Sequence, residues 1–157
     1  MNDPIAHAIG TTAERLAAKM RKGAQRVVLA GGPRTGKTTL AETIGALFGG
    51  RVYKTDDLID SHDWSEASAE CARWMKASPG PWIVEGVAAV RALRKWLDLN
   101  PTGTPCELVI WMGTPVVRRT PGQETMAKGC ATVWNGKPGE RGVLARLLDR
   151  GVMVEED

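Results

Sequence analysis

The chain has 157 residues, 43% of them hydrophobic and 25% charged, which is the size and balance of one globular domain with its own core. Its apolar runs are shorter than the roughly 20 residues that a helix needs to cross a bilayer, so we expect no membrane partner. The net charge of +3 is too small to indicate a polyanionic partner by itself, and the amino terminus lacks the basic and apolar segments of a secretory signal.

The first part of the chain predicts two helices and two strands. Apolar residues recur at a helical period over residues 4–22, and Gly23 ends that helix. The apolar run RVVLA at 26–30 indicates a strand that is buried on both faces. A helix over 39–49, closed by glycines, and a short strand at 51–55 follow.

The middle of the chain continues the alternation of helix and strand. A polar helix from Trp64 to Ala77 ends at a Ser-Pro-Gly turn, and PWIVEGV at 81–87 indicates a third strand. A helix that reaches Leu99 comes next, and CELVIWM at 106–112 indicates a fourth strand.

The last third of the chain is expected to hold two helices separated by loops. Thr114 and Pro115 are typical of the cap and first position of a helix. Residues 120–139 contain four glycines and two prolines, which predicts a loop-rich, mobile stretch. A final helix over 140–150 and an edge strand at 151–155 complete the chain.

Buried strands that alternate with helices predict an α/β fold: a three-layer sandwich with a mostly parallel sheet of four or five strands. We expect a single domain over 1–157, made of an amino-terminal helix (1–23), a core (26–112), a lid-like region (113–139) and a C-terminal helix and tail (140–157). Ligands of such sheets bind at the carboxyl ends of the strands.

Residues 31–38, GGPRTGKT, match the phosphate-loop pattern G-x-x-x-x-G-K-[ST] in full, between the strand and the helix that this pattern requires. The glycines let backbone N–H groups turn toward phosphate oxygens, and a helix that begins near Lys37 adds the positive end of its dipole. We expect Lys37 to bridge the β- and γ-phosphates of ATP and the Thr38 hydroxyl to bind Mg²⁺. The predicted nucleotide-binding residues are Gly31, Gly32, Pro33, Arg34, Thr35, Gly36, Lys37, Thr38 and Thr39.

Asp56 and Asp57 end the second predicted strand and bear on the kind of reaction. A phosphate loop also serves ATPases and GTPases, although the chain has no guanine-specifying N-K-x-D. A carboxylate at this strand end can accept the proton of an attacking hydroxyl, and its neighbour can help to hold Mg²⁺. The alternative is that both residues cap the next turn. We favour function, with Asp56 as the base and Asp57 near the metal.

Glu85 ends the third predicted strand, directly after largely apolar residues. A carboxylate there can bind a metal-bound water or the acceptor hydroxyl. The fourth strand ends in Trp111 and Met112, so it offers no separate Walker B acid. Glu85 or one of the two aspartates must take that role, and Gly86 allows the backbone to approach closely.

Arg118 and Arg119 follow the fourth predicted strand, and one of them can neutralise charge on the transferred phosphoryl group. At most one of two adjacent helical residues faces a given site, so both stay candidates, and the alternative is a pair of exposed charges. An acidic segment at 56–70 and a basic one at 118–150 would suit a metal–nucleotide complex if they faced one cleft.

Cysteine and tryptophan are the remaining informative residue types. The three cysteines are widely spaced and form no metal or disulfide pattern, which favours buried structural thiols in a reducing cytoplasm: Cys71, Cys106 and Cys130. Two of the six tryptophans lie in predicted strands and are expected in the core: Trp82 and Trp111. The others either pack in the core or stack on a base: Trp64, Trp74, Trp96 and Trp134.

With these residues in place, the chain resembles the P-loop kinases of the nucleoside, gluconate and polynucleotide kinase group over residues 26–119. GGPRTGKTTLA is similar to the phosphate loop of that group, TDDLI to its second-strand Asp-Asp element, and IVEGV to a third-strand element of uridine kinase-like enzymes. By this resemblance Asp56 is the general base, and Arg118 or Arg119 is the lid arginine. TPGQETMAKGCATVW at 120–134 looks like a segment of phage kinases that modify DNA, most specifically 5-hydroxymethyluracil DNA kinases.

The resemblance implies an ATP- and Mg²⁺-dependent kinase that phosphorylates the hydroxymethyl group of 5-hydroxymethyluracil in DNA. Such an enzyme would act in the cytoplasm, or in the host cytoplasm if it is phage-encoded. A kinase for a nucleoside or sugar is the alternative in the same class. A nucleotide-dependent switch or assembly ATPase is the alternative in another class. The chain departs from the group by lacking a separate nucleotide-monophosphate-binding domain and a long lid with spaced arginines.

Overall fold

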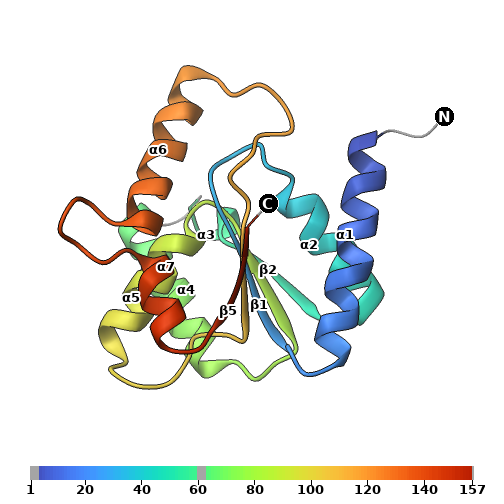
Figure 1. The fold of residues 1–157 in the computed structure, drawn as a ribbon, viewed down its shortest axis with the longest axis horizontal. Helices are drawn as coiled ribbons and strands as arrows, with labels where there is room; N and C mark the ends of the chain where they lie inside the picture. The colour runs from blue at the N-terminus through green and yellow to red at the C-terminus, as the bar shows by residue number, and fades with distance from the viewer. Residues whose placement is uncertain (1–3, 60–62, 157) are drawn as a thin grey trace.

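Five parallel strands form one sheet in the order β2-β3-β1-β4-β5, in a computed structural model that describes residues 4–59 and 63–156 (Figure 1). The strands are β1 Arg26–Ala30, β2 Arg51–Lys54, β3 Trp82–Glu85, β4 Leu108–Trp111 and β5 Met153–Glu156. Val28 in β1 pairs with Val84 in β3 on one side and with Val109 in β4 on the other. The predicted parallel sheet and its fifth, edge strand are confirmed.

The central strand β1 is apolar without a break because both of its faces are covered. Successive side chains of a strand point to opposite faces. Val27 and Leu29 accordingly belong to one buried hydrophobic cluster, whereas Val28 and Ala30 belong to another. An alternating polar pattern would have placed polar side chains in one of these two cores.

Helices form a layer on each face of the sheet, as Figure 1 shows. On one face, the cluster around Leu29 is completed by two helices, α1 Pro4–Arg21 and α2 Lys37–Phe48. On the other face, the cluster around Val28 is completed by four helices, α4 Trp64–Ala77, α5 Ala89–Leu99, α6 Pro121–Asn135 and α7 Val143–Asp149. The predicted three-layer α/β arrangement is therefore confirmed. Within the described residues, no helix is both long enough and apolar enough to cross a membrane.

The strand order creates a crevice at the carboxyl end of β1. After β1 the chain crosses past β3 to form the edge strand β2, and after β3 it crosses to the opposite side of β1 to form β4. Helices that leave neighbouring strands in opposite directions separate at this point, and ligands of parallel sheets bind in the resulting crevice. The loop 31–36 lies there, between β1 and α2.

The segment 113–139 differs from its prediction. No helix begins at Thr114, and the stretch expected to be loops instead contains the helix α6 Pro121–Asn135. The Thr120 hydroxyl accepts a hydrogen bond from the Gln123 backbone N–H, and the Gln123 side chain accepts one from the Thr120 N–H. This capping box fixes the helix start. Thr114 cannot form one, because the third residue after it is Val117.

The three cysteines are free thiols, and each is buried: Cys71, Cys106 and Cys130. Burial raises the pKa of Cys71 to about 12, which keeps the thiol neutral at physiological pH. Burial raises the pKa of Cys106 as well. The prediction that these cysteines are buried thiols is therefore confirmed.

Candidate active site

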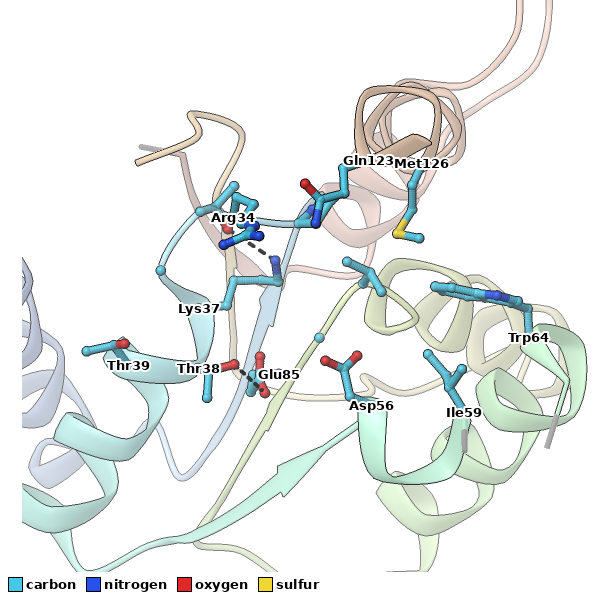
Figure 2. A pocket seen from close by; sticks show the side chains of 15 residues that line it. Arg34, Lys37, Thr38, Thr39, Asp56, Ile59, Trp64, Glu85, Gln123 and Met126 are labelled. Atoms are coloured by element: carbon cyan, nitrogen blue, oxygen red, sulfur yellow. Dashed lines mark hydrogen bonds between the residues drawn. The ribbon is translucent and has the colours of Figure 1, made fainter. Parts of the chain in front are cut away.

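A cavity of about 650 Å³ lies at the carboxyl ends of β1, β2 and β3 (Figure 2). It is lined by Pro33, Arg34, Thr35, Gly36, Lys37, Thr38, Thr39, Asp56, Ile59, Trp64, Glu85, Gly86, Val87, Gln123 and Met126. Seven of the nine predicted nucleotide-binding residues are among them, and the other two, Gly31 and Gly32, form the start of the same loop. Two predicted carboxylates, Asp56 and Glu85, also line the cavity.

The loop 31–36 requires its glycines for steric reasons. Gly31 has φ +140°, and a Cβ there would overlap the Met112 carbonyl oxygen. A Cβ on Gly32 would lie 2.7 Å from the Ala127 Cβ of α6. Gly36 adopts the left-handed conformation at the N-cap of α2, with φ 87°. The loop can therefore bring its backbone close to both β4 and α6, and the N–H groups of the first turn of α2 remain available to an anion.

Lys37 is buried at the cavity wall, with 5% of its surface exposed. Its Nζ donates hydrogen bonds to the Gly32 carbonyl oxygen and to Thr35 Oγ1, the latter at 3.1 Å. Burial lowers the pKa of Lys37, while the nearby Glu85 and Asp56 act in the opposite direction. The loop residues Gly32 and Thr35 thus hold the Lys37 cation at the cavity wall.

Glu85 is 2% exposed and lies directly beside the start of α2. Its Oε1 accepts a hydrogen bond of 3.0 Å from the Thr38 hydroxyl. Burial raises the pKa of Glu85, whereas the Thr38 hydrogen bond and the charge of Lys37 oppose that shift. The predicted pairing of a strand-end acid with the phosphate loop is therefore present as a direct contact.

Asp56 and Asp57 have different surroundings although they are adjacent. They begin the short helix α3 Asp56–Ile59, and both are exposed. The Asp56 side chain points into the cavity on the side of Glu85 (Figure 2). Asp57, which is also within the described part of the chain, does not line the cavity. The structure thus gathers Asp56, Glu85 and Thr38 at one place and leaves Asp57 outside it.

Arg119 contacts the loop 31–36 and is largely buried, whereas Arg118 is not. Arg119 Nε donates a 2.7 Å hydrogen bond to the Pro33 carbonyl oxygen, and its side chain is 7% exposed. Arg118 is exposed. Both line a separate open hollow with Thr120, Pro121 and Glu124. Of the two candidates, Arg119 is the one in contact with the loop.

The basic segment 118–150 does not gather at the cavity. Arg141 pairs with Asp149, and Arg146 pairs with Asp98 at 2.8 Å. Arg150 donates to backbone carbonyls, including that of Gly103 at 2.9 Å. Part of the acidic segment, residues 60–62, lies outside the described residues. We expected an acidic and a basic segment to face one cleft. These three arginines of the basic segment have partners elsewhere and do not line the cavity.

Four further residues that the sequence did not single out as a group line the cavity: Ile59, Trp64, Gln123 and Met126. Gln123 and Met126 belong to α6, so missing that helix concealed them. The signal that could have found them is Thr120-Pro121-Gly122-Gln123, which satisfies the capping-box pattern. Val87 also lines the cavity.

We expect Gly86→Ala to lower the free energy of unfolding by about 2–4 kcal/mol. Gly86 has φ +137°, and an added Cβ would overlap Oγ1 of the buried Thr55. Gly122→Ala is the matched control, because a Cβ there meets nothing within 4 Å. It should change stability by less than about 1 kcal/mol, toward higher stability. Denaturant titration of both variants checks this, and equal stabilities would contradict it.

The chain matches no known protein-family model, and no curated protein is significantly similar to it in sequence. The residues of the cavity must therefore support any functional inference. Their donor set fits Mg–ATP, because a hydroxyl and two carboxylates offer the oxygen ligands that Mg²⁺ prefers. No cluster of three or more acidic, histidine or cysteine side chains suited to a metal occurs within the described residues. Phosphate oxygens and water complete a Mg²⁺ shell in such sites, so no larger cluster is required.

Proposed function

We propose that this chain is a P-loop kinase that transfers the γ-phosphate of ATP to a hydroxyl group. The supporting observation is one cavity in which Lys37 and Thr38 lie with Glu85 and Asp56 at the carboxyl ends of parallel strands. A phosphate loop alone would serve a switch protein equally well. An exposed carboxylate beside that loop, facing an open cavity, supports proton transfer from an acceptor hydroxyl.

Each residue has a role that follows from its position. Lys37 and the N–H groups at the start of α2 bind the β- and γ-phosphates, and Thr38 with Glu85 holds Mg²⁺, directly or through water. Bound Mg²⁺ neutralises charge on the phosphates. The acceptor oxygen forms a bond to the γ-phosphorus as the bond to the β,γ-bridging oxygen breaks. Asp56 takes the proton of the acceptor hydroxyl, and ADP leaves.

As the acceptor we favour the hydroxymethyl group of 5-hydroxymethyluracil in DNA, which the resemblance of 120–134 implies. Basic side chains near the cavity favour a polyanion. Arg91 lies over the cavity residue Trp64, and Lys95, on the same face of α5, donates hydrogen bonds to the neighbouring Ser65. A nucleoside or sugar remains the alternative acceptor, and DNA binding that weakens steeply with salt distinguishes the two.

The test is incubation with γ-labelled ATP and Mg²⁺ beside a panel of acceptors: unmodified DNA, hydroxymethyluracil DNA, nucleosides and sugars. We expect label on hydroxymethyluracil DNA and no label when Mg²⁺ is chelated. If no acceptor gains label while free phosphate accumulates, the chain is an ATPase of the switch or assembly class. Label on nucleosides or sugars alone would support the small-molecule kinase.

A further inference from the structure

The cavity has two chemically different ends. Lys37, Thr38 and Thr39 lie at one end, and Trp64, Ile59 and Met126 lie at the other (Figure 2). Asp56 lies between them. The Trp64 ring extends toward the middle of the cavity, with Met126 on one side of its plane and Ile59 on the other. The proposed base therefore separates a phosphate-binding end from an apolar, aromatic one.

Trp64 is distinct among the six tryptophans, all of which lie within the described residues, because it is the one that lines the cavity. Each of the others has a packing role. Trp82, Trp96 and Trp134 are buried. Trp74 stacks on Tyr53 with ring centroids 4.3 Å apart, and Trp111 stacks on Trp134 at 4.8 Å.

The position of Trp64 is fixed by contacts on α4 and α5. Trp64 is the first residue of α4, whose N-cap Asp63 accepts a 2.7 Å hydrogen bond from the Glu66 N–H. Lys95 of α5 donates a 2.9 Å hydrogen bond to Ser65 Oγ and a second to the Ser65 carbonyl oxygen. The Arg91 guanidinium lies 5.9 Å from the centroid of the Trp64 ring. A cation at this distance attracts the ring and restrains it.

We infer that Trp64, Ile59 and Met126 form the acceptor subsite, and that they bind the flat ring that carries the reacting hydroxyl. This inference rests on the proposed kinase function and adds the residues that hold and orient the acceptor. A ring stacked on Trp64 projects its hydroxyl toward Asp56 and the phosphate end. Arg91 acts as a positioning residue, because it holds the Trp64 ring and lines no part of the cavity.

A polyhydroxylated acceptor does not suit this end of the cavity. A sugar needs several hydrogen-bonding partners, and each polar group that is buried without one costs binding energy. The described side chains at the Trp64 end are apolar apart from the indole N–H of Trp64. The nearest polar side chains that line the cavity are those of Asp56 and Gln123. A stacked ring instead gains from the aromatic face and from the Met126 thioether.

The test measures binding of 5-hydroxymethyl-2′-deoxyuridine, and of a single-stranded oligonucleotide that contains it, to protein loaded with Mg²⁺ and a non-hydrolysable ATP analogue. Trp64→Ala should weaken binding of both probes about 5- to 150-fold, the range for loss of one base stack. Trp64→Leu keeps apolar volume without a flat face and should lose as much, whereas Trp64→Phe should lose about threefold or less. The matched control is Trp74→Phe on the same helix, which should bind both probes as the wild type does.

Arg91 is tested by steady-state kinetics with the labelled acceptor. Arg91→Gln should raise the acceptor KM severalfold without changing the ATP KM or kcat, and Arg91→Lys should restore part of the loss. A purely structural defect would change all three constants together, and that result would overturn the positioning role.

The outcomes separate this inference from the kinase proposal. If the ATP analogue fails to bind the wild type, the kinase proposal fails. If the analogue binds but neither ring probe binds, or if Trp64→Ala and Trp64→Leu bind the probes as the wild type does, the acceptor inference is overturned and the kinase proposal stands. Phosphorylation of sugars that is as efficient as that of ring acceptors would overturn it too.

Discussion

Replacing Asp56 by asparagine should lower kcat by about 10²- to 10⁴-fold while the affinity for ATP stays within about twofold. Asparagine has the same shape as aspartate but cannot accept the proton of an attacking hydroxyl. Lys37 donates its hydrogen bonds to Gly32 and Thr35, and Thr38 donates to Glu85, so the change at Asp56 leaves these contacts intact. Single-turnover transfer to the acceptor, together with calorimetry of ATP binding, measures both quantities.

Asp57→Asn is the sharpest comparison, because it makes the same chemical change one residue away. Asp57 is exposed and does not line the cavity, so its variant should keep kcat within about threefold. An equal loss in the two variants would show that the negative charge of the pair, not a base at position 56, matters. Unchanged turnover in Asp56→Asn would remove Asp56 from the mechanism.

The end of the cavity that holds Lys37 and Thr38 could be predicted from the sequence because it is built locally. The loop 31–36 joins a strand to the next helix, and its glycines, lysine and threonine are contiguous. Asp56 and Glu85 could be predicted too, since parallel strands end at the same edge of a sheet. What the sequence left open was orientation. Asp56 lines the cavity and Asp57 does not, which depends on how α3 turns after β2.

The opposite end of the cavity depends on contacts between distant segments, and local patterns predicted it poorly. The glycines of 121–135 argued against a helix there, but the structure has one. Gly129 lies where α6 packs closely on α5, because a Cβ at that position would come within 3.1 Å of the Arg91 guanidinium. Helix propensity was overridden there by packing against α5. The sequence predicts that a helix begins at Trp64, but the place of Trp64 in the cavity depends on α4, α5 and α6 together.

Lys37→Met should lower kcat/KM for ATP by about 10³-fold and weaken ATP binding as well, since the cation is expected to contact phosphate in both the ground state and the transition state. Lys22→Met is the matched control, because this substitution makes the same change in charge at an exposed residue directly after α1. Its kinetics should equal those of the wild type. Labelled-ATP transfer and calorimetry on the two variants check the prediction.

Loss of activity in Lys37→Met should come without loss of stability. Burial lowers the pKa of Lys37, so the folded chain binds the proton more weakly than the unfolded chain. Protonated Lys37 therefore opposes folding below its folded pKa, and that cost is relieved as the pH rises toward the ordinary value of 10.5. Methionine removes the cost at neutral pH, so the variant should melt at or above the wild-type temperature. A variant that unfolds at lower temperature would mean that the hydrogen bonds of Lys37 to Gly32 and Thr35 outweigh its desolvation.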